Sequence, residues 1–160
     1  MRKVFVLGVA AVTAFAVVGA AGADSPPPTT FVTPMDTFQE VPACVAGDNS
    51  TRGLAIFHVV DQATGTVAYK LIANNLPGTP RAAHIHLAPR GTAGGIVQPL
   101  MLMAGEENGV IADATFTSPA IVAALQTNGN AYYVNVHTEV CPGGALRGQL
   151  GEHGPPGTAE

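Results

Sequence analysis

Short stretches of β-prone residues, separated by turn residues at intervals of about 8–12 positions, are the feature that most limits what this chain can form. Seven such stretches fall at residues 53–60, 66–72, 82–87, 96–101, 110–116, 131–138 and 145–150. This spacing is typical of antiparallel sandwiches and barrels. The expected fold is therefore all-β, an antiparallel Greek-key-like β-sandwich or barrel.

One segment predicts a helix instead. Ser118 is a favourable N-cap, Pro119 suits the first helical position, and the apolar residues 121–125 follow directly. Asn128 and Gly129 then favour the end of the helix. We expect this to be the one short helix of the domain.

The amino-terminal residues predict an export signal. Arg2 and Lys3 precede an apolar run at residues 4–21, which ends in the small-residue cleavage pattern of residues 21–23. A retained membrane anchor is the alternative, because the run approaches the length of a spanning helix. The expected organisation is a signal peptide at 1–23, a Pro-rich leader at 24–34, a β domain at 35–150 and a flexible tail at 151–160.

The leader is expected to form neither a helix nor a central strand, because prolines lack the backbone donor. With the signal removed, no membrane span is expected in the mature chain. The protein should then be secreted, periplasmic or associated with the cell envelope.

The charge balance limits the classes of partner. Cleavage of the signal leaves five basic and eleven acidic residues, a formal charge of −6. This balance argues against binding to nucleic acid or to anionic membranes. The sequence has no phosphate-binding glycine loop and no nucleophile elbow. We therefore assign no catalytic residue, and a protein or glycan partner is expected for a non-enzymatic module.

Cys44 and Cys141 are the two cysteines of the chain, and both lie in the part expected to be exported. A disulfide between them is the prediction. Two free thiols or a cysteine-containing metal site are the alternatives. The disulfide would join the beginning and the end of the domain.

Histidines on two strands share the face that points away from the expected core. Side chains alternate along a strand, so an inward Ile85 places His84 and His86 together on the outer face. The same alternation places His137 on the outer face of the strand at 131–138.

Zinc and copper are the metals that this arrangement favours. Imidazole is a good ligand for both, and His84 and His86 from one strand with His137 from another would leave an open coordination position. The alternative is that these histidines only hold loops through hydrogen bonds to backbone carbonyls or to Asn135. His58 is expected to be packed or at the rim, with a role as fourth ligand as its alternative.

Other polar residues are expected to have structural roles. Asn135 and Arg147 should share the outer patch with the histidines. Glu40 and Arg147 are candidates for an ion pair near the disulfide, and two exposed charges are the alternative. His153, in the tail, is expected to be solvated.

Several of these residues together resemble the CHRD domain, the module found in chordin and in many exported bacterial proteins. The resemblance rests on Glu40-Val41-Pro42, Ala83-His84-Ile85-His86, residues 133–138 and Leu146-Arg147-Gly148-Gln149-Leu150. It implies an extracellular or periplasmic β-sandwich, with no established activity for bacterial members. The growth-factor antagonism of chordin involves other modules and is not transferred.

A weaker resemblance links the chain to copper/zinc superoxide dismutase. It rests on the His-x-His strand, a further histidine, the late Arg147 and an intrachain disulfide. Five histidines cannot supply both metal sites of such an enzyme, and Cys141 precedes Arg147 rather than following it. The leading prediction is thus an exported binding or envelope-associated module. The alternative is a copper or zinc protein, and a dismutase-like oxidoreductase comes third.

Overall fold

Eight antiparallel strands form one sheet in this computed structural model, which describes residues 26–151. The strands are β1 (Thr30–Asp36), β2 (Arg52–Asp61), β3 (Thr66–Asn74), β4 (Pro80–Leu87), β5 (Gly95–Leu100), β6 (Gly109–Thr117), β7 (Tyr132–Thr138) and β8 (Leu146–Gln149). Their order across the sheet is β5-β4-β7-β8-β1-β2-β3-β6. The expected signal peptide and all but the first residue of the expected tail lie outside the described residues.

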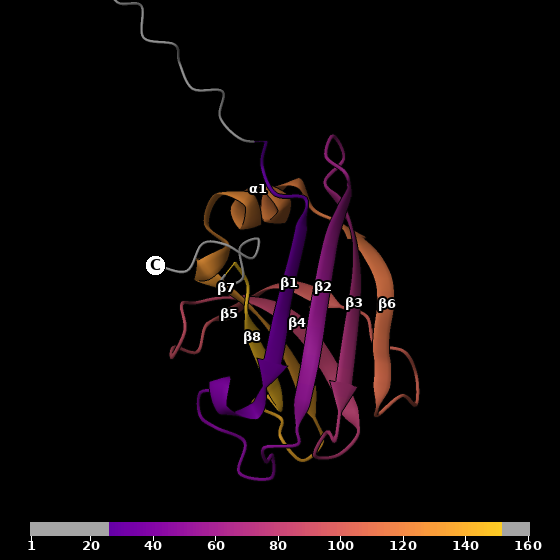
Figure 1. Cartoon of the computed structure of the whole chain (residues 1–160), viewed down its shortest axis with the longest axis vertical. Coiled ribbons are helices and arrows are strands. Elements are labelled where there is room, and N and C mark those ends of the chain that lie inside the picture. Colours follow the sequence, from indigo (N-terminus) through magenta and orange to yellow (C-terminus); the bar gives the residue numbers. More distant parts are fainter. Residues whose placement is uncertain (1–25, 152–160) are drawn as a thin grey trace, which may run out of the picture.

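The sheet curls into a nearly closed barrel. β1, β2, β3 and β6 run side by side in front of β4, β5 and β7 (Figure 1). At the seam, the chain that follows β5 meets β6, where the Met103 N–H donates to the Ile111 carbonyl at 2.8 Å. β7, β4, β5 and β6 thus follow one another around the barrel in Greek-key order. The prediction of an all-β Greek-key-like fold is confirmed.

Alternating side chains from both halves of the sheet fill the barrel. β2 contributes Ala55 and Phe57, and β3 contributes Tyr69 and Leu71, all buried. The rings of Phe57 and Tyr69 stack with centroids 6.0 Å apart. On the opposite wall Ile85 of β4 is buried as predicted from its position between two histidines. The apolar interior therefore lies between the two halves, and the polar residues of β4 and β7 are on its outside.

β1 corrects one expectation. Thr30–Pro34 belongs to a strand in the middle of the sheet, so the interpretation of residues 24–34 as a leader that forms no central strand is wrong for these five residues. Phe31 and Met35 alternate with exposed residues and enter the core. β1 pairs with β2 along its whole length but with β8 only through Asp36 and Arg147. Pro34 is tolerated because one side of the strand is almost unpaired there.

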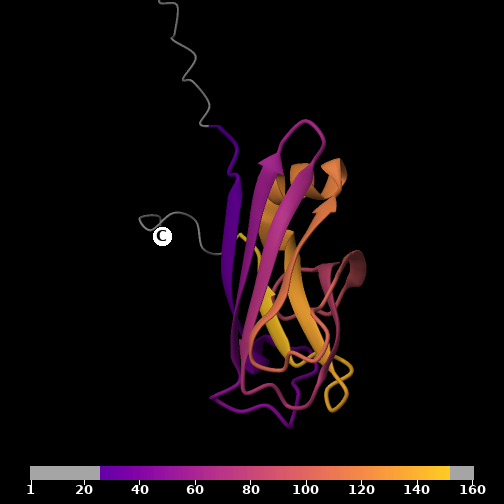
Figure 2. The same ribbon diagram turned by 90° about the vertical axis from the view of Figure 1, so that its right-hand side faces the viewer.

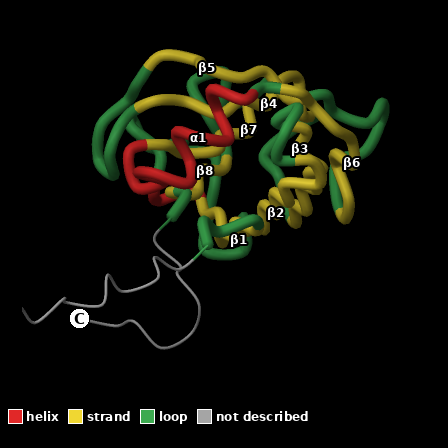
Figure 3. Tube along the Cα trace, turned by 90° about the horizontal axis from the view of Figure 1, so that it is seen from above, coloured by secondary structure: helices red, strands yellow, loops and turns green. Residues whose placement is uncertain are grey.

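The predicted helix is present as α1 (Pro119–Asn128). Ser118 caps it, its hydroxyl accepting the Ile121 N–H at 3.4 Å, and Pro119 occupies the first turn. Ile121, Val122 and Leu125 are buried. The helix covers one end of the barrel (Figures 2 and 3). No helix within residues 26–151 is long and apolar enough to cross a membrane.

The hairpin between β2 and β3 offers a test of this packing. Gly65 has a φ of +69°, and an added Cβ would lie 2.5 Å from backbone atoms of Pro119 at the start of α1. Gly91 has a similar φ of +76° but open space around it. We expect Gly65→Ala to lower the free energy of unfolding by about 1–2 kcal/mol more than Gly91→Ala does. Urea denaturation measures the difference, and equal losses would show that the hairpin is free to move away from α1.

Candidate metal centre

The outer face of β4, β7 and β8 is buried rather than exposed, which corrects the expectation of an outward polar patch. Tyr133 and Asn135 of β7 are each 3% exposed, and Arg147 of β8 is 1% exposed. Two connecting segments cover this face, one from residue 36 to residue 51 and one from residue 88 to residue 94. The domain therefore has a second interior, which is polar.

Hydrogen bonds hold the segment at 88–94 against this face. The Arg147 guanidinium donates to the carbonyls of Pro89 and Thr92, each at 2.9 Å. The same guanidinium lies 3.6 Å above the centre of the Tyr133 ring, and the Tyr133 hydroxyl accepts the Gly94 N–H at 3.1 Å. Gln149 also donates to the Ala88 carbonyl at 2.9 Å. Arg147 is thus a central support of the covering segment.

Three histidines meet at the edge of this polar interior. His84 and His86 come from β4, and His137 comes from β7, the neighbouring strand. Their ring centroids are 5.0 Å apart for His84 and His137, and 5.8 Å apart for His86 and His137. One nitrogen of each ring lies within 4.8 Å of the others. The three residues named from the sequence are therefore brought together.

Backbone carbonyls orient two of the rings. His86 Nδ1 lies 2.9 Å from the Gly94 carbonyl, and His137 Nδ1 lies 2.9 Å from the Pro142 carbonyl. A carbonyl oxygen only accepts, so Nδ1 must carry the hydrogen in both rings. When these imidazoles are neutral, Nε2 is left with a free lone pair. This is the arrangement that usually orients a metal-ligating histidine.

The inward nitrogens have no partner in the described part of the chain. His84 Nδ1, His86 Nε2 and His137 Nε2 are buried atoms without a hydrogen bond. Burial lowers the pKa of His84, and the neighbouring His137 and His86 lower it further. Burial also lowers the pKa of His86; the Gly94 carbonyl opposes this shift, whereas His137 and Arg147 add to it. The neutral, electron-donating forms are therefore favoured near pH 7.

The other histidines do not join this group. His58 is exposed on β2, where its Nδ1 lies 2.8 Å from the Thr30 hydroxyl. The expectation of a packed histidine is therefore wrong, and so is the alternative of a fourth ligand, because His58 is not part of the cluster. His153 lies outside the described residues. The cluster within residues 26–151 consists of three imidazoles, and no carboxylate or thiolate belongs to it.

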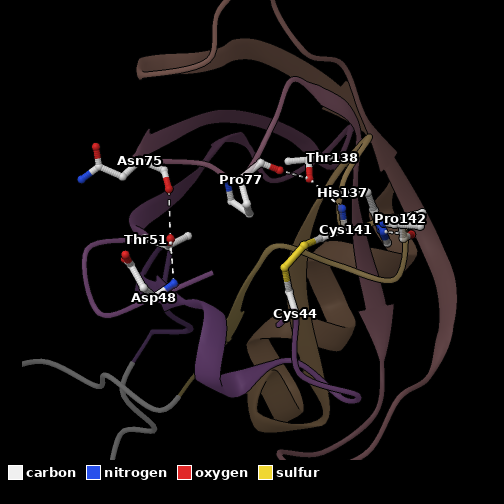
Figure 4. The surroundings of a disulfide bond; sticks show 9 residues. All are labelled: Cys44, Asp48, Thr51, Asn75, Pro77, His137, Thr138, Cys141 and Pro142. Carbon is white, nitrogen blue, oxygen red and sulfur yellow. Dashed lines mark hydrogen bonds between the residues drawn. A yellow bond between two sulfur atoms is a disulfide. The ribbon is translucent and has the colours of Figure 1, made fainter. Parts of the chain in front are cut away.

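The predicted disulfide between Cys44 and Cys141 is present and joins residues 97 positions apart (Figure 4). It links the segment at 36–51 to the connection between β7 and β8. Glu40 lies in the first of these segments, where it is 5% exposed and a carboxyl oxygen accepts a hydrogen bond from the Asn135 amide at 3.2 Å. The alternative that Glu40 and Arg147 are two exposed charges is therefore wrong, since both residues are buried.

Glu40 has an unusual environment for a carboxyl group. Burial raises its pKa to about 8, although Arg147 and the Asn135 hydrogen bond favour the charged form. Asp36 adds a smaller repulsion. Glu40 is therefore mostly protonated at neutral pH. The positive charge of Arg147 lowers the pKa of Glu40, but by less than burial raises it.

Sequence reasoning did not find the groups that orient the histidines. The carbonyls of Gly94 and Pro142 leave no side-chain signal, because any residue supplies a carbonyl. Tyr133 lies on the same face of β7 as Asn135, and its ring stacks on His86 at a centroid distance of 4.8 Å. Its contact with the ring depends on the pairing of β4 with β7.

Comparison with known protein families gives one match. The model of the CHRD domain family matches residues 31–150, a range that includes all eight strands except Thr30 and contains all three histidines. The chain belongs to the CHRD domain family. No curated protein and no solved structure matches this CHRD chain. The resemblance to the dismutase fold therefore stays a prediction.

Proposed function

We propose that this chain is an exported metal-binding module in which His84, His86 and His137 bind one zinc or copper ion. The observation that carries the proposal is the convergence of three buried ring nitrogens that have no hydrogen-bond partner among the described residues. Each buried nitrogen left unpaired costs about 1–3 kcal/mol. One metal ion would satisfy all three.

The donor set fits these metals. Neutral imidazole suits zinc and copper, whereas calcium and magnesium prefer oxygen ligands. Ligand nitrogens about 2.0–2.1 Å from a zinc ion lie roughly 3.3–3.6 Å from one another. In the structure the three ring nitrogens lie within 4.8 Å of one another, so small ring rotations must bring them closer when the metal binds. The half-buried His84 and His137 can make these rotations.

Export and the disulfide are consistent with this function. Disulfides persist in oxidising compartments, where Cys44 and Cys141 would stay paired. The signal predicted at residues 1–23 would direct the protein to a secreted or envelope location. The metal site would then serve a module outside the cytoplasm.

Loss of two ligands tests the proposal. We expect the purified protein to bind one Zn²⁺ per chain, and His84→Ala/His86→Ala to weaken binding by more than about 100-fold, because loss of an outer-shell partner alone costs about 10–100-fold. Isothermal titration with zinc measures the affinity, and elemental analysis measures the metal that co-purifies.

His58→Ala is the matched control, because His58 is an exposed strand histidine outside the cluster. It should bind zinc as the unaltered protein does. Absence of zinc and copper binding at micromolar metal would contradict the proposal and leave the three histidines as supports for the loops at Gly94 and Pro142.

A further inference from the structure

The disulfide belongs to the same turn that orients His137. Cys141 precedes Pro142, whose carbonyl faces His137 Nδ1 at 2.9 Å (Figure 4). Thr138, which follows His137, bonds to Cys141 twice. The Thr138 N–H donates to the Cys141 carbonyl at 3.2 Å, and the Cys141 N–H donates to the Thr138 hydroxyl at 3.0 Å. The cross-linked residue and the ligand residue are therefore parts of one hydrogen-bonded unit.

Cys44, the other cysteine of the disulfide, ties this turn to a second segment of the chain. Cys44 lies in the covering segment at 36–51, which also carries Glu40. The Glu40 carboxyl packs against Gly144, where an added Cβ would overlap it, and it accepts a hydrogen bond from Asn135. The disulfide thus joins two segments that meet beside the histidines.

A small reductant can reach the bond. A cavity of about 260 Å³ is lined by residues 42–46 and 140–144 and includes both cysteines. Cys44 is partly exposed, whereas Cys141 is 7% exposed. Attack on the Cys44 sulfur is therefore the open route for a thiolate.

We propose that the redox state of the Cys44–Cys141 disulfide sets the affinity of the three-histidine site for metal, with tight binding in the oxidised form. This inference rests on the proposed metal-binding function. Reduction by a dithiol breaks the S–S bond and transfers two electrons and two protons to form the Cys44 and Cys141 thiols, while the dithiol becomes a disulfide. The turn then keeps only its hydrogen bonds, and the Pro142 carbonyl no longer has a fixed position against His137.

The expected size of the effect follows from the role of Pro142. Loss of an outer-shell partner of a ligating histidine weakens metal binding by about 10–100-fold. Linkage requires the reverse effect to be equal, so bound metal must make the disulfide harder to reduce by the same factor. A tenfold effect corresponds to a midpoint potential about 30 mV more negative.

Zinc affinity in two forms of the protein gives the first test. Zn²⁺ is titrated against a competing chromophoric chelator in the oxidised protein and in Cys44→Ser/Cys141→Ser, which has no thiolate to bind zinc itself. We expect the variant to bind at least about 10-fold more weakly while its circular dichroism spectrum is unchanged. Equal or tighter binding by the folded variant would overturn the inference.

A second measurement decides the matter if the cysteine variant does not fold. The disulfide of the unaltered protein is equilibrated in glutathione buffers with and without saturating Zn²⁺, and His84→Ala/His86→Ala is the control for zinc bound by glutathione. We expect zinc to lower the midpoint by about 30 mV or more in the unaltered protein only. An unchanged midpoint with zinc bound overturns this inference alone, whereas failure of the oxidised protein to bind zinc overturns the proposed function with it.

Discussion

Replacing Arg147 by methionine is expected to lower the free energy of unfolding by about 3–5 kcal/mol, because two buried carbonyls each lose a hydrogen bond from a charged donor, worth roughly 1.5–3 kcal/mol. The guanidinium is 1% exposed and donates to the carbonyls of Pro89 and Thr92. Methionine fills a similar volume without donors, so both carbonyls lose their partner. Urea denaturation at pH 7 measures the change.

Arg81→Met is the matched control for this prediction. Arg81 also pairs through its guanidinium, with Glu139 at 2.6 Å, but its side chain is 63% exposed. The expected loss is about 0–1 kcal/mol, as for other exposed pairs. If both variants lose less than about 1 kcal/mol, the segment at 88–94 does not depend on Arg147, and the polar interior is held by other contacts.

The segment that Arg147 supports also carries the carbonyl that orients His86. Gly94 accepts from His86 Nδ1 and donates its N–H to Tyr133. Loosening of the segment should therefore weaken zinc binding as well as stability. The residues that hold this segment against the barrel therefore also orient His86, one of the three proposed ligands.

Much of the fold could be predicted because the information is local. Alternation placed Ile85 in the core and three histidines on one face, and the pattern from Ser118 to Gly129 gave the helix. The disulfide followed from two cysteines in a chain expected to be exported. Each of these predictions uses residues close together in the sequence or a fact about the whole chain.

The failures have a different physical origin. β1 was missed because Pro34 argues against a central strand, and only the sparse pairing between β1 and β8 makes it tolerable. The polar face was expected to be exposed because alternation separates two faces but does not say what covers each of them. Glu40 and Asn135, 95 residues apart, meet only through the covering segment. Contacts of this kind depend on the tertiary structure and leave no local pattern.

Glu40 should give the protein a stability that falls as the pH rises. Its pKa is raised to about 8 in the folded protein, chiefly by burial, from an ordinary value of 4.5. The folded state then holds a proton that the unfolded state has released, so stability is highest below pH 4.5 and decreases between pH 4.5 and about 8. The slope contributed by one such group is at most about 1.4 kcal/mol per pH unit.

Glu40→Gln isolates this contribution, because glutamine resembles the protonated carboxyl and does not titrate. The difference in unfolding free energy between variant and unaltered protein cancels the titration of the histidines. We expect the variant to gain stability with rising pH relative to the unaltered protein and to be more stable by up to about 3 kcal/mol at pH 7. Urea denaturation at several pH values between 4.5 and 8 measures this difference, and Glu106→Gln, at an exposed position, should leave it unchanged. If glutamine instead destabilises the protein equally at every pH, Glu40 is ionised throughout this range and its charge is stabilised by Arg147.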